Sequence, residues 1–233
     1  MSLTISSSDA FRQESTSIWA ALHAHPFITE LAEGSLPLDK FRFFLEQDIL
    51  YLEEYARCLA MGAAKSRNEA ELQYFASDLT KVIEAEIPNN RALLDQVIEL
   101  GADDRGGSLG KAPANVAYTS YMHSLAMRGG PLEILASLLP CSWSYAEIAL
   151  ALKDRTELTH PVYGGWIAYF SEPEYLEVVA GMRRDFDTLV AEEATNEARR
   201  REVAEIFATS SRLERSFWEM AYTLEQWPDL VAG

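Results

Sequence analysis

The sequence is poor in cysteine, in basic residues and in long apolar runs, and each shortage excludes a class of protein. The cysteines, Cys58 and Cys141, are too few for a disulfide framework and are typical of a reducing compartment. Lys and Arg number 20 against 36 Asp and Glu, giving a net charge of -16. A nucleic-acid-binding protein needs a basic surface, so this charge argues against nucleic acid and against an anionic membrane surface.

Membrane-spanning and secretory segments are also not expected. No apolar run approaches the roughly 20 residues that cross a bilayer. The N-terminus lacks the basic region and the long apolar region of a signal peptide. Linkers rich in Pro, Gly and Ser are missing too, and so are internal repeats. We therefore expect a cytoplasmic protein without a membrane or nucleic-acid partner, in which residues 1–233 form a single domain.

Strand alternation is almost absent, and apolar positions recur with helical spacing along most of the chain. Capping residues and prolines predict where the helices begin. Helix starts are predicted near Ser7, Pro26, Pro37, Asn68, Pro113, Pro131, Pro173 and Asn196. The predicted fold class is all-α, a single-domain helical bundle, and the cavities between bundle helices are natural ligand sites.

Three details of this helical pattern depend on local signals. One helix is predicted from the Ser7 region to about Ala24. Pro88 is predicted to interrupt a helical stretch that begins at Asn68 and resumes to about Leu100. Residues 101–110 form the clearest loop, and residues 154–165 are predicted to be irregular before a short helix that carries Trp166 and Tyr169.

Cys141 is the most informative residue, because it follows Pro140 within a segment, 131–152, that otherwise has the pattern of a buried helix. A proline inside a helix removes a backbone hydrogen bond and costs roughly 3 kcal/mol. A destabilising proline next to a thiol therefore indicates that this segment forms a functional site. A free cysteine is also often an inert buried apolar residue, and this segment alone leaves both interpretations open.

A second helix places Asp48, Tyr51 and Tyr55 on one face, at positions i, i+3 and i+7. Phe44 and Leu52 share that face, so it points inward. A buried aspartate is costly unless it is paired or lies in a polar cleft. The pattern fits either a ligand-binding carboxylate or a core aspartate that accepts a bond from a tyrosine hydroxyl.

Further polar residues stand beside aromatic ones on three other helices. Their i, i+4 pairs are Tyr118 with Met122, Cys141 with Tyr145, and Glu214 with Trp218. An alternative for Glu214 is an ion pair with a neighbouring arginine on a solvated face. If the four helices converge, they form an aromatic box with a thiol and two carboxylates. Such a box suits a flat, nitrogen-rich heterocycle, with aromatic rings stacking, carboxylates binding ring nitrogens and amino groups, and a thiolate as nucleophile.

The four histidines do not predict a metal site. His23 and His25 face different ways, and His123 is alone on its helix. Glu157 and His160 have the spacing of a di-iron ligand pair, but no second copy of the pair is present. No metal and no cofactor is therefore expected, and His25 with the following proline is interpreted as a helix start.

Eight short motifs, in order along the chain, carry a resemblance to a known family. They are His25-Pro26-Phe27, Gly34-Ser35-Leu36-Pro37, Gln47-Asp48 with Tyr51-Leu52, Tyr118-Thr119-Ser120, Leu139-Pro140-Cys141-Ser142-Trp143-Ser144-Tyr145, His160-Pro161-Val162-Tyr163, Trp166-Ile167-Ala168-Tyr169 and Phe217-Trp218-Glu219-Met220-Ala221-Tyr222. With this ordered set the chain resembles the TenA (thiaminase II) family, in its cysteine-bearing branch, over nearly its whole length. The resemblance implies a haem-oxygenase-like all-α fold that binds no haem, assembled as a homotetramer.

The resemblance also implies an activity, hydrolysis at the methylene attached to an aminopyrimidine. The salvage substrate is 4-amino-5-aminomethyl-2-methylpyrimidine, which gives the hydroxymethyl pyrimidine and ammonia, and thiamin can be cleaved by the same chemistry. Cys141 matches the family's nucleophile, Asp48 the carboxylate that binds the pyrimidine amino group, and Glu214 the carboxylate paired with the ring. The matching substrate-binding tyrosines are Tyr51, Tyr118, Tyr145 and Tyr169.

The chain departs from the family pattern at three places. Arginines flank Glu214 where aromatics are expected, Ser142 follows Cys141 where a tyrosine is common, and residues 86–90 are unusual in a way that would alter access to the pocket. Two other functions stay open. One is a non-catalytic regulator that binds thiamin or a pyrimidine without releasing ammonia. The other is an oxidase or haem enzyme on the same scaffold.

Overall fold

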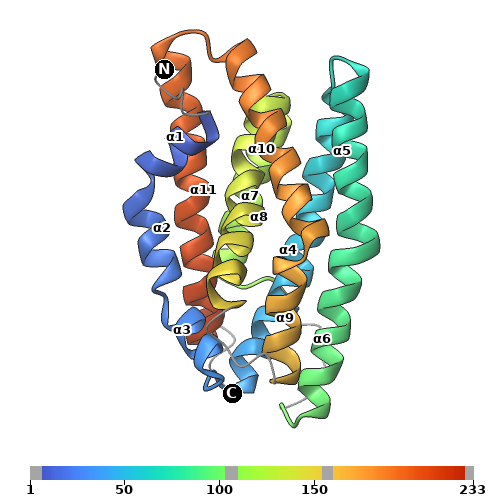
Figure 1. Cartoon of the computed structure of the whole chain (residues 1–233), viewed down its shortest axis with the longest axis vertical. Coiled ribbons are helices and arrows are strands. Elements are labelled where there is room, and N and C mark those ends of the chain that lie inside the picture. Colours follow the sequence, from blue (N-terminus) through green and yellow to red (C-terminus); the bar gives the residue numbers. More distant parts are fainter. Residues whose placement is uncertain (1–6, 103–109, 154–159, 229–233) are drawn as a thin grey trace.

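The structure is a computed structural model, and it describes residues 7–102, 110–153 and 160–228. Within these ranges it contains helices and no strand, which confirms the all-α prediction. The long helices run roughly along the longest axis of the molecule (Figure 1). Their bounds are α1 Ser7–Glu14, α2 Thr16–His23, α3 Pro26–Glu33, α4 Leu38–Lys65, α5 Glu69–Lys81, the π-helical turn η1 Val82–Glu86, α6 Ile87–Glu99, α7 Pro113–Arg128, α8 Pro131–Lys153, α9 Pro161–Ser171, α10 Pro173–Glu193 and α11 Glu197–Thr223.

The centre of the bundle is α8, which contacts α4, α7, α9, α10 and α11. Nearly all of its residues are buried, because a helix that is apolar all round is stable only when other helices surround it. Among the described helices it alone is long and apolar enough to cross a membrane, yet 83% of its apolar window is buried inside the bundle. This burial is that of a core helix.

Several predicted helix starts are confirmed by their caps. The Nδ1 atom of His25 accepts a hydrogen bond from the Phe27 amide at 3.2 Å, so His25 is the N-cap of α3. Asn68 and Asn196 cap α5 and α11 by accepting amide hydrogen bonds at 2.9 Å. At a helix start that the sequence pattern did not predict, His160 caps α9 by accepting from the Tyr163 amide at 3.3 Å.

The single helix predicted up to Ala24 is wrong, because the chain turns at Ser15 and forms α1 and α2. The Thr16 hydroxyl donates to the Gln13 carbonyl at 2.6 Å, a local side-chain bond that competes with the helical ladder. The turn lets α1 pack against α10 while α2 lies along α11 (Figure 1).

The predicted interruption at Pro88 is also wrong. The chain stays helical from Glu69 to Glu99, passing through the π turn Val82–Glu86 (η1) just before the proline. In this turn the Ile87 amide donates to the Val82 carbonyl, five residues back. Pro88 then lies in the first turn of α6, where its missing amide is tolerated. The result is a widened helical turn, and such turns are frequently found at functional sites.

The irregular segment predicted for residues 154–165 is partly wrong. Residues 154–159 lie outside the described part of the chain, but α9 begins at Pro161 rather than near Trp166. The His160 cap and the proline at the first position favour this earlier start.

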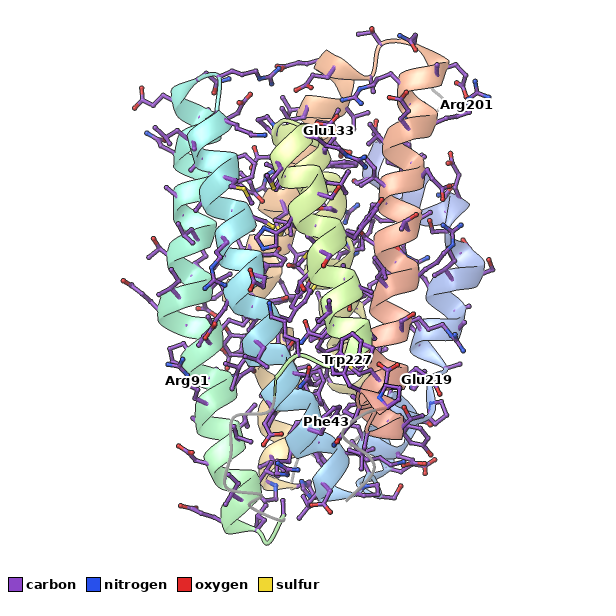
Figure 2. All side chains as sticks on the ribbon, turned by 180° about the vertical axis from the view of Figure 1, so that it is seen from behind. Phe43, Arg91, Glu133, Arg201, Glu219 and Trp227 are labelled. Carbon is purple, nitrogen blue, oxygen red and sulfur yellow. The ribbon has the colours of Figure 1, made fainter. Side chains whose placement is uncertain are left out.

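The chain after α11 folds back against the segment before α7. The indole of Trp227 donates to the Lys111 carbonyl at 3.0 Å, just before α7. Figure 2, seen from behind, labels Trp227 and Glu219 in the lower half of the molecule. Inside, Gln47 accepts from the Ala112 amide at 2.9 Å and donates to the Gly110 carbonyl at 3.1 Å. These bonds fix the start of α7 against α4.

Candidate active site

Four helices bring six of the seven predicted site residues into one buried cluster. Asp48 and Glu214 are each 2% exposed and Cys141 is 6% exposed. The tyrosines surround them, and each is fully or almost fully buried. The cluster consists of Asp48 and Tyr51 on α4, Tyr118 on α7, Cys141 and Tyr145 on α8, and Glu214 on α11.

Glu214 faces the core rather than an arginine on the surface. Its carboxylate accepts a hydrogen bond from the Tyr118 hydroxyl at 2.7 Å. Its neighbour Arg212 pairs instead with Glu205 on the outside of α11, at 2.9 Å. The alternative of a solvated ion pair for Glu214 is therefore wrong, since the helix turns the arginine outward and the glutamate inward.

Asp48 is held by an asparagine and not by a tyrosine hydroxyl. The Nδ2 atom of Asn90 donates to the Asp48 carboxylate at 2.7 Å. Burial raises the pKa of Asp48 to about 7, against the lowering effect of the Asn90 bond. Near neutral pH this carboxyl group therefore exists in both protonation states.

The Cys141 thiol lies among negative groups. Burial raises its pKa well above the ordinary value, and Glu214, Asp48 and Glu86 raise it further, Glu214 most strongly of the three. The helix is unbroken through Pro140. A free thiol in these surroundings is protonated at neutral pH, so it needs a base before it can act as a nucleophile.

Glu214 is suited to be that base. Burial raises its pKa to about 8, the Tyr118 bond opposes that rise, and the charge of Asp48 adds to it. A carboxyl group whose pKa lies near the working pH can accept a proton in one step and donate it in the next. Perturbed carboxyls beside a thiol in one cluster are typical of active sites.

The aromatic rings form the walls of the cluster. Tyr51 lies 4.9 Å from Tyr118 and 5.5 Å from Phe217, measured between ring centroids. The ring centroids of Tyr145 and Trp218 lie 5.1 Å apart. Burial raises the pKa of Tyr145, and the nearby charges of Asp48, Glu214 and Cys141 raise it further. These rings provide the flat surfaces that a heterocycle would stack on.

Several buried polar atoms of this region lack protein partners within the described part of the chain. They include the Oδ1 atom of Asn90, the Nδ2 atom of Asn89 and the indole nitrogen of Trp218. Leaving a buried polar atom unpaired costs about 1–3 kcal/mol, so each such atom calls for an explanation. A polar ligand bound beside Asp48 would provide a partner for the Asn90 oxygen.

Tyr169 is the predicted residue that lies apart from the cluster. It is partly exposed on α9 and lines an adjoining cavity together with Ser142, the residue after Cys141. Burial raises its pKa, and the charges of Glu86 and Glu172 raise it further. Tyr169 therefore belongs to the approach to the cluster.

Sequence reasoning assigned no site role to three residues of this region, Asn90, Glu86 and Tyr175, and it placed Tyr55 only on the face of Asp48. The departure from the family pattern at residues 86–90 is the signal for the first two. Tyr55 lies on the same face of α4 as Asp48, and its hydroxyl lies 3.0 Å from the Ser142 hydroxyl. Tyr175, whose hydroxyl donates to the Ser142 carbonyl at 3.3 Å, gives no signal in the sequence.

His25 and His160 cap helices, whereas His23 and His123 lie beside the carboxylates of Glu147 and Glu54. His160 caps α9, while Glu157, its partner in the weak metal pattern, lies outside the described residues. In the described ranges no three His, Cys, Asp or Glu side chains gather in a group able to hold a metal ion.

Comparison with known proteins places the chain in a family. The family model described as TENA/THI-4/PQQC matches residues 12–224. A relative from Halalkalibacterium halodurans, named aminopyrimidine aminohydrolase, is 36% identical over 211 residues, which cover 90% of this chain and 92% of the relative. The solved structure of a TenA homologue from P. horikoshii OT3 is 31% identical, with a TM-score of 0.82, and the match covers 94% of this chain and 99% of that one.

A more distant structure identifies the fold. A domain of unknown function with a heme oxygenase-like fold, from Shewanella denitrificans OS217, is 14% identical, with a TM-score of 0.70. The match covers 96% of this chain and 94% of that one. The predicted fold class is confirmed. From the extent of the family match and the identity to its members, the chain belongs to the TENA/THI-4/PQQC family.

Proposed function

We propose that the protein is an aminopyrimidine aminohydrolase of thiamin salvage. It releases ammonia from 4-amino-5-aminomethyl-2-methylpyrimidine to give the hydroxymethyl pyrimidine, and it also cleaves thiamin. The observation that carries the proposal is the buried thiol of Cys141 beside the carboxyl groups of Asp48 and Glu214. The relative that bears the name of this activity is 36% identical over 90% of the chain.

In the proposed mechanism, binding orients the ring before any bond changes. The Asp48 carboxylate, held by Asn90, accepts a hydrogen bond from the pyrimidine amino group. Tyr51 and Tyr145 flank the ring. Holding the reacting atoms in line can lower a reaction barrier by about 7–11 kcal/mol. The hydrogen bond from Asn90, which fixes the position of Asp48, therefore supports catalysis.

The first chemical step moves one proton and forms one bond. Glu214 takes the thiol proton of Cys141 and passes it to a ring nitrogen, while the sulfur adds to a ring carbon. The Tyr118 hydroxyl bond keeps the Glu214 carboxyl in place during this exchange. Burial raises the pKa values of both the thiol and the carboxyl, so the site favours the protonated form of each group.

The second step expels the leaving group from the exocyclic methylene. Electrons from the protonated ring nitrogen push out the amine, which leaves as ammonia once it is protonated. Water then adds to the methylene carbon, the carbon–sulfur bond breaks, and the aromatic ring and the thiol are restored. The balance is one water consumed, one ammonia released and no net change at Cys141.

An ammonia-release assay tests the proposal. The purified protein is incubated with the aminomethyl pyrimidine, its N-formyl form and thiamin, and ammonia or the hydroxymethyl pyrimidine is measured. We expect turnover of the aminomethyl compound. Tight binding with no product would overturn the proposal in favour of a pyrimidine-binding regulator. A coloured protein that contains iron would favour an oxidase or a haem enzyme.

A single domain over residues 1–233, a cytoplasmic location and a homotetrameric assembly also belong to this proposal. Both cysteines are free, in keeping with a reducing compartment. Sedimentation velocity of the purified protein and fractionation of the cells that produce it test the assembly and the location.

A further inference from the structure

A cavity of about 310 Å³ adjoins the candidate active site. It lies where α9 and α10 face the continuous helix formed by α5, η1 and α6 (Figure 1). Its wall toward the cluster is Ser142, the residue after Cys141. The volume is at the lower limit of ordinary small-molecule pockets, so it suits one group about the size of a ring.

The cavity and the cluster share hydrogen-bonded walls. The Tyr55 hydroxyl lies 3.0 Å from the Ser142 hydroxyl, and the Tyr175 hydroxyl donates to the Ser142 carbonyl. The charge of Glu86 acts on both Cys141 and Asp48. The cavity therefore lies directly beside the cluster, separated from Cys141 by the next residue of α8.

The charge of the lining is strongly negative. Four carboxyl groups, those of Asp78, Glu86, Glu172 and Glu174, accompany one cation, Lys81. Lys81 lies 3.4 Å from Asp78, so its charge is already engaged. The remaining acidic side chains of the lining are left without a protein counter-charge among the described residues.

Of the three remaining carboxyl groups, Glu86 is half-buried, whereas Glu172 and Glu174 are exposed. The π turn places it on the cavity wall, where protein atoms surround it and its accessible surface faces the cavity. Its carboxyl group makes no hydrogen bond or ion pair with any described residue. Burial raises its pKa to about 8, and the charges of Asp48 and Asp78 add to the rise. A carboxylate that faces a cavity and has no protein partner is available to pair with a cationic ligand there.

The other walls are aromatic. Tyr55, Tyr169 and Tyr175 line the cavity, and the rings of Tyr169 and Tyr175 lie 5.8 Å apart. Tyrosine rings attract cations through their negative faces. Rings and carboxylates together select an organic cation, because an inorganic ion would gain little from the rings.

We propose that this cavity is a subsite for an organic cation carried on the pyrimidine methylene, and that Glu86 is the residue that recognises its positive charge. The identity of this cation as the leaving group depends on the proposed function. The preference of the cavity for an organic cation does not, since it depends on the lining alone.

Binding of a fragment without the pyrimidine tests the subsite separately from catalysis. The probes are 3,4-dimethylthiazolium, a permanent cation, and 4-methylthiazole, its neutral counterpart, titrated calorimetrically at about pH 9 so that Glu86 is ionised. We expect the cation to bind about tenfold more tightly than the neutral ring. Glu86→Gln removes this preference, whereas Glu84→Gln, an exposed glutamate on the same turn, keeps it.

Equal binding of the two probes, absence of saturable binding of the cation, or an unchanged preference in Glu86→Gln would overturn the subsite. The link to catalysis has its own measurement, the ratio of kcat/KM for thiamin to that for the N-formyl aminomethyl pyrimidine. We expect Glu86→Gln to lower this ratio about tenfold. If the unmodified protein turns over neither compound, the proposed function fails while the result of the fragment titration stands.

Discussion

The bond between Asn90 and Asp48 allows a quantitative prediction about pH dependence. A hydrogen bond to a charged group contributes about 1.5–3 kcal/mol, and 1.36 kcal/mol corresponds to one pKa unit. In Asn90→Ala the ionised form of Asp48 loses this bond, so its pKa rises from about 7 by roughly 1–2 units. At pH 7 the ionised fraction falls from about one half to between about one tenth and one hundredth.

If ionised Asp48 binds the pyrimidine amino group, activity follows that fraction. We expect kcat/KM for the aminomethyl pyrimidine at pH 7 to fall about 5- to 50-fold in Asn90→Ala. The acidic limb of the pH profile moves upward by the same roughly 1–2 units. Most of the loss is recovered above about pH 9, which a general structural defect would not allow.

The adjacent asparagine provides a matched control. The Nδ2 atom of Asn89 has no hydrogen-bond partner in the described part of the chain, so Asn89→Ala should leave the acidic limb in place. Asp48, Glu214 and Glu86 titrate in the same pH range, so the acidic limb of the pH profile reports all three carboxyl groups together. The quantity to compare between variants is therefore the shift of this limb along the pH axis. An acidic limb that does not move in Asn90→Ala, or a loss equal at all pH values, would refute the reasoning.

Three further predictions follow from the packing and the charges. Tyr118→Phe removes the donor to Glu214, and we expect kcat/KM to fall about 10- to 100-fold at pH 7, with circular dichroism unchanged; an unaltered rate would show that the bond is not used. The folded protein keeps protons on Asp48, Glu86 and Glu214 up to about pH 7 or 8, whereas the unfolded chain loses them near pH 4. The free energy of unfolding in urea should therefore decrease as pH rises between these values, and Glu214→Gln should reduce that slope; a flat profile would contradict the raised pKa values. Gly62→Ala would place a Cβ atom 2.4 Å from the Phe75 ring, costing about 1–3 kcal/mol of stability, while Gly181→Ala on α10, with its nearest atom at 3.7 Å, should be neutral or stabilising; equal effects in urea titrations would argue against this packing.

The helices of the bundle could be predicted largely from periodicity and caps. The prolines and asparagines that begin α3, α5, α7, α10 and α11 act locally, so the signal lies within a few residues of the start. The turn at Ser15 and the π turn before Pro88 could not be predicted, because both depend on what the neighbouring helices require. A proline is compatible with either a break or a widened turn, and packing decides between them.

The residues of the candidate site could be predicted better than the hydrogen bonds between them. Helical spacing placed Asp48 with Tyr51, and Cys141 with Tyr145, on single faces, while the family resemblance joined these faces and added Glu214. The partner of Asp48 could not be predicted, because Asn90 lies 42 positions along the chain and meets Asp48 only through the packing of α6 on α4. The position of Tyr169 outside the cluster likewise depends on how α9 packs.

The central claim is that Cys141 is the nucleophile, and one substitution tests it most directly. Ammonia release from the aminomethyl pyrimidine is measured for Cys141→Ser and for Cys58→Ser, the other buried cysteine, with circular dichroism to verify both folds. We predict that Cys58→Ser keeps turnover within about threefold, whereas Cys141→Ser loses it by at least about 10³-fold. Full turnover in a folded Cys141→Ser protein would contradict the account.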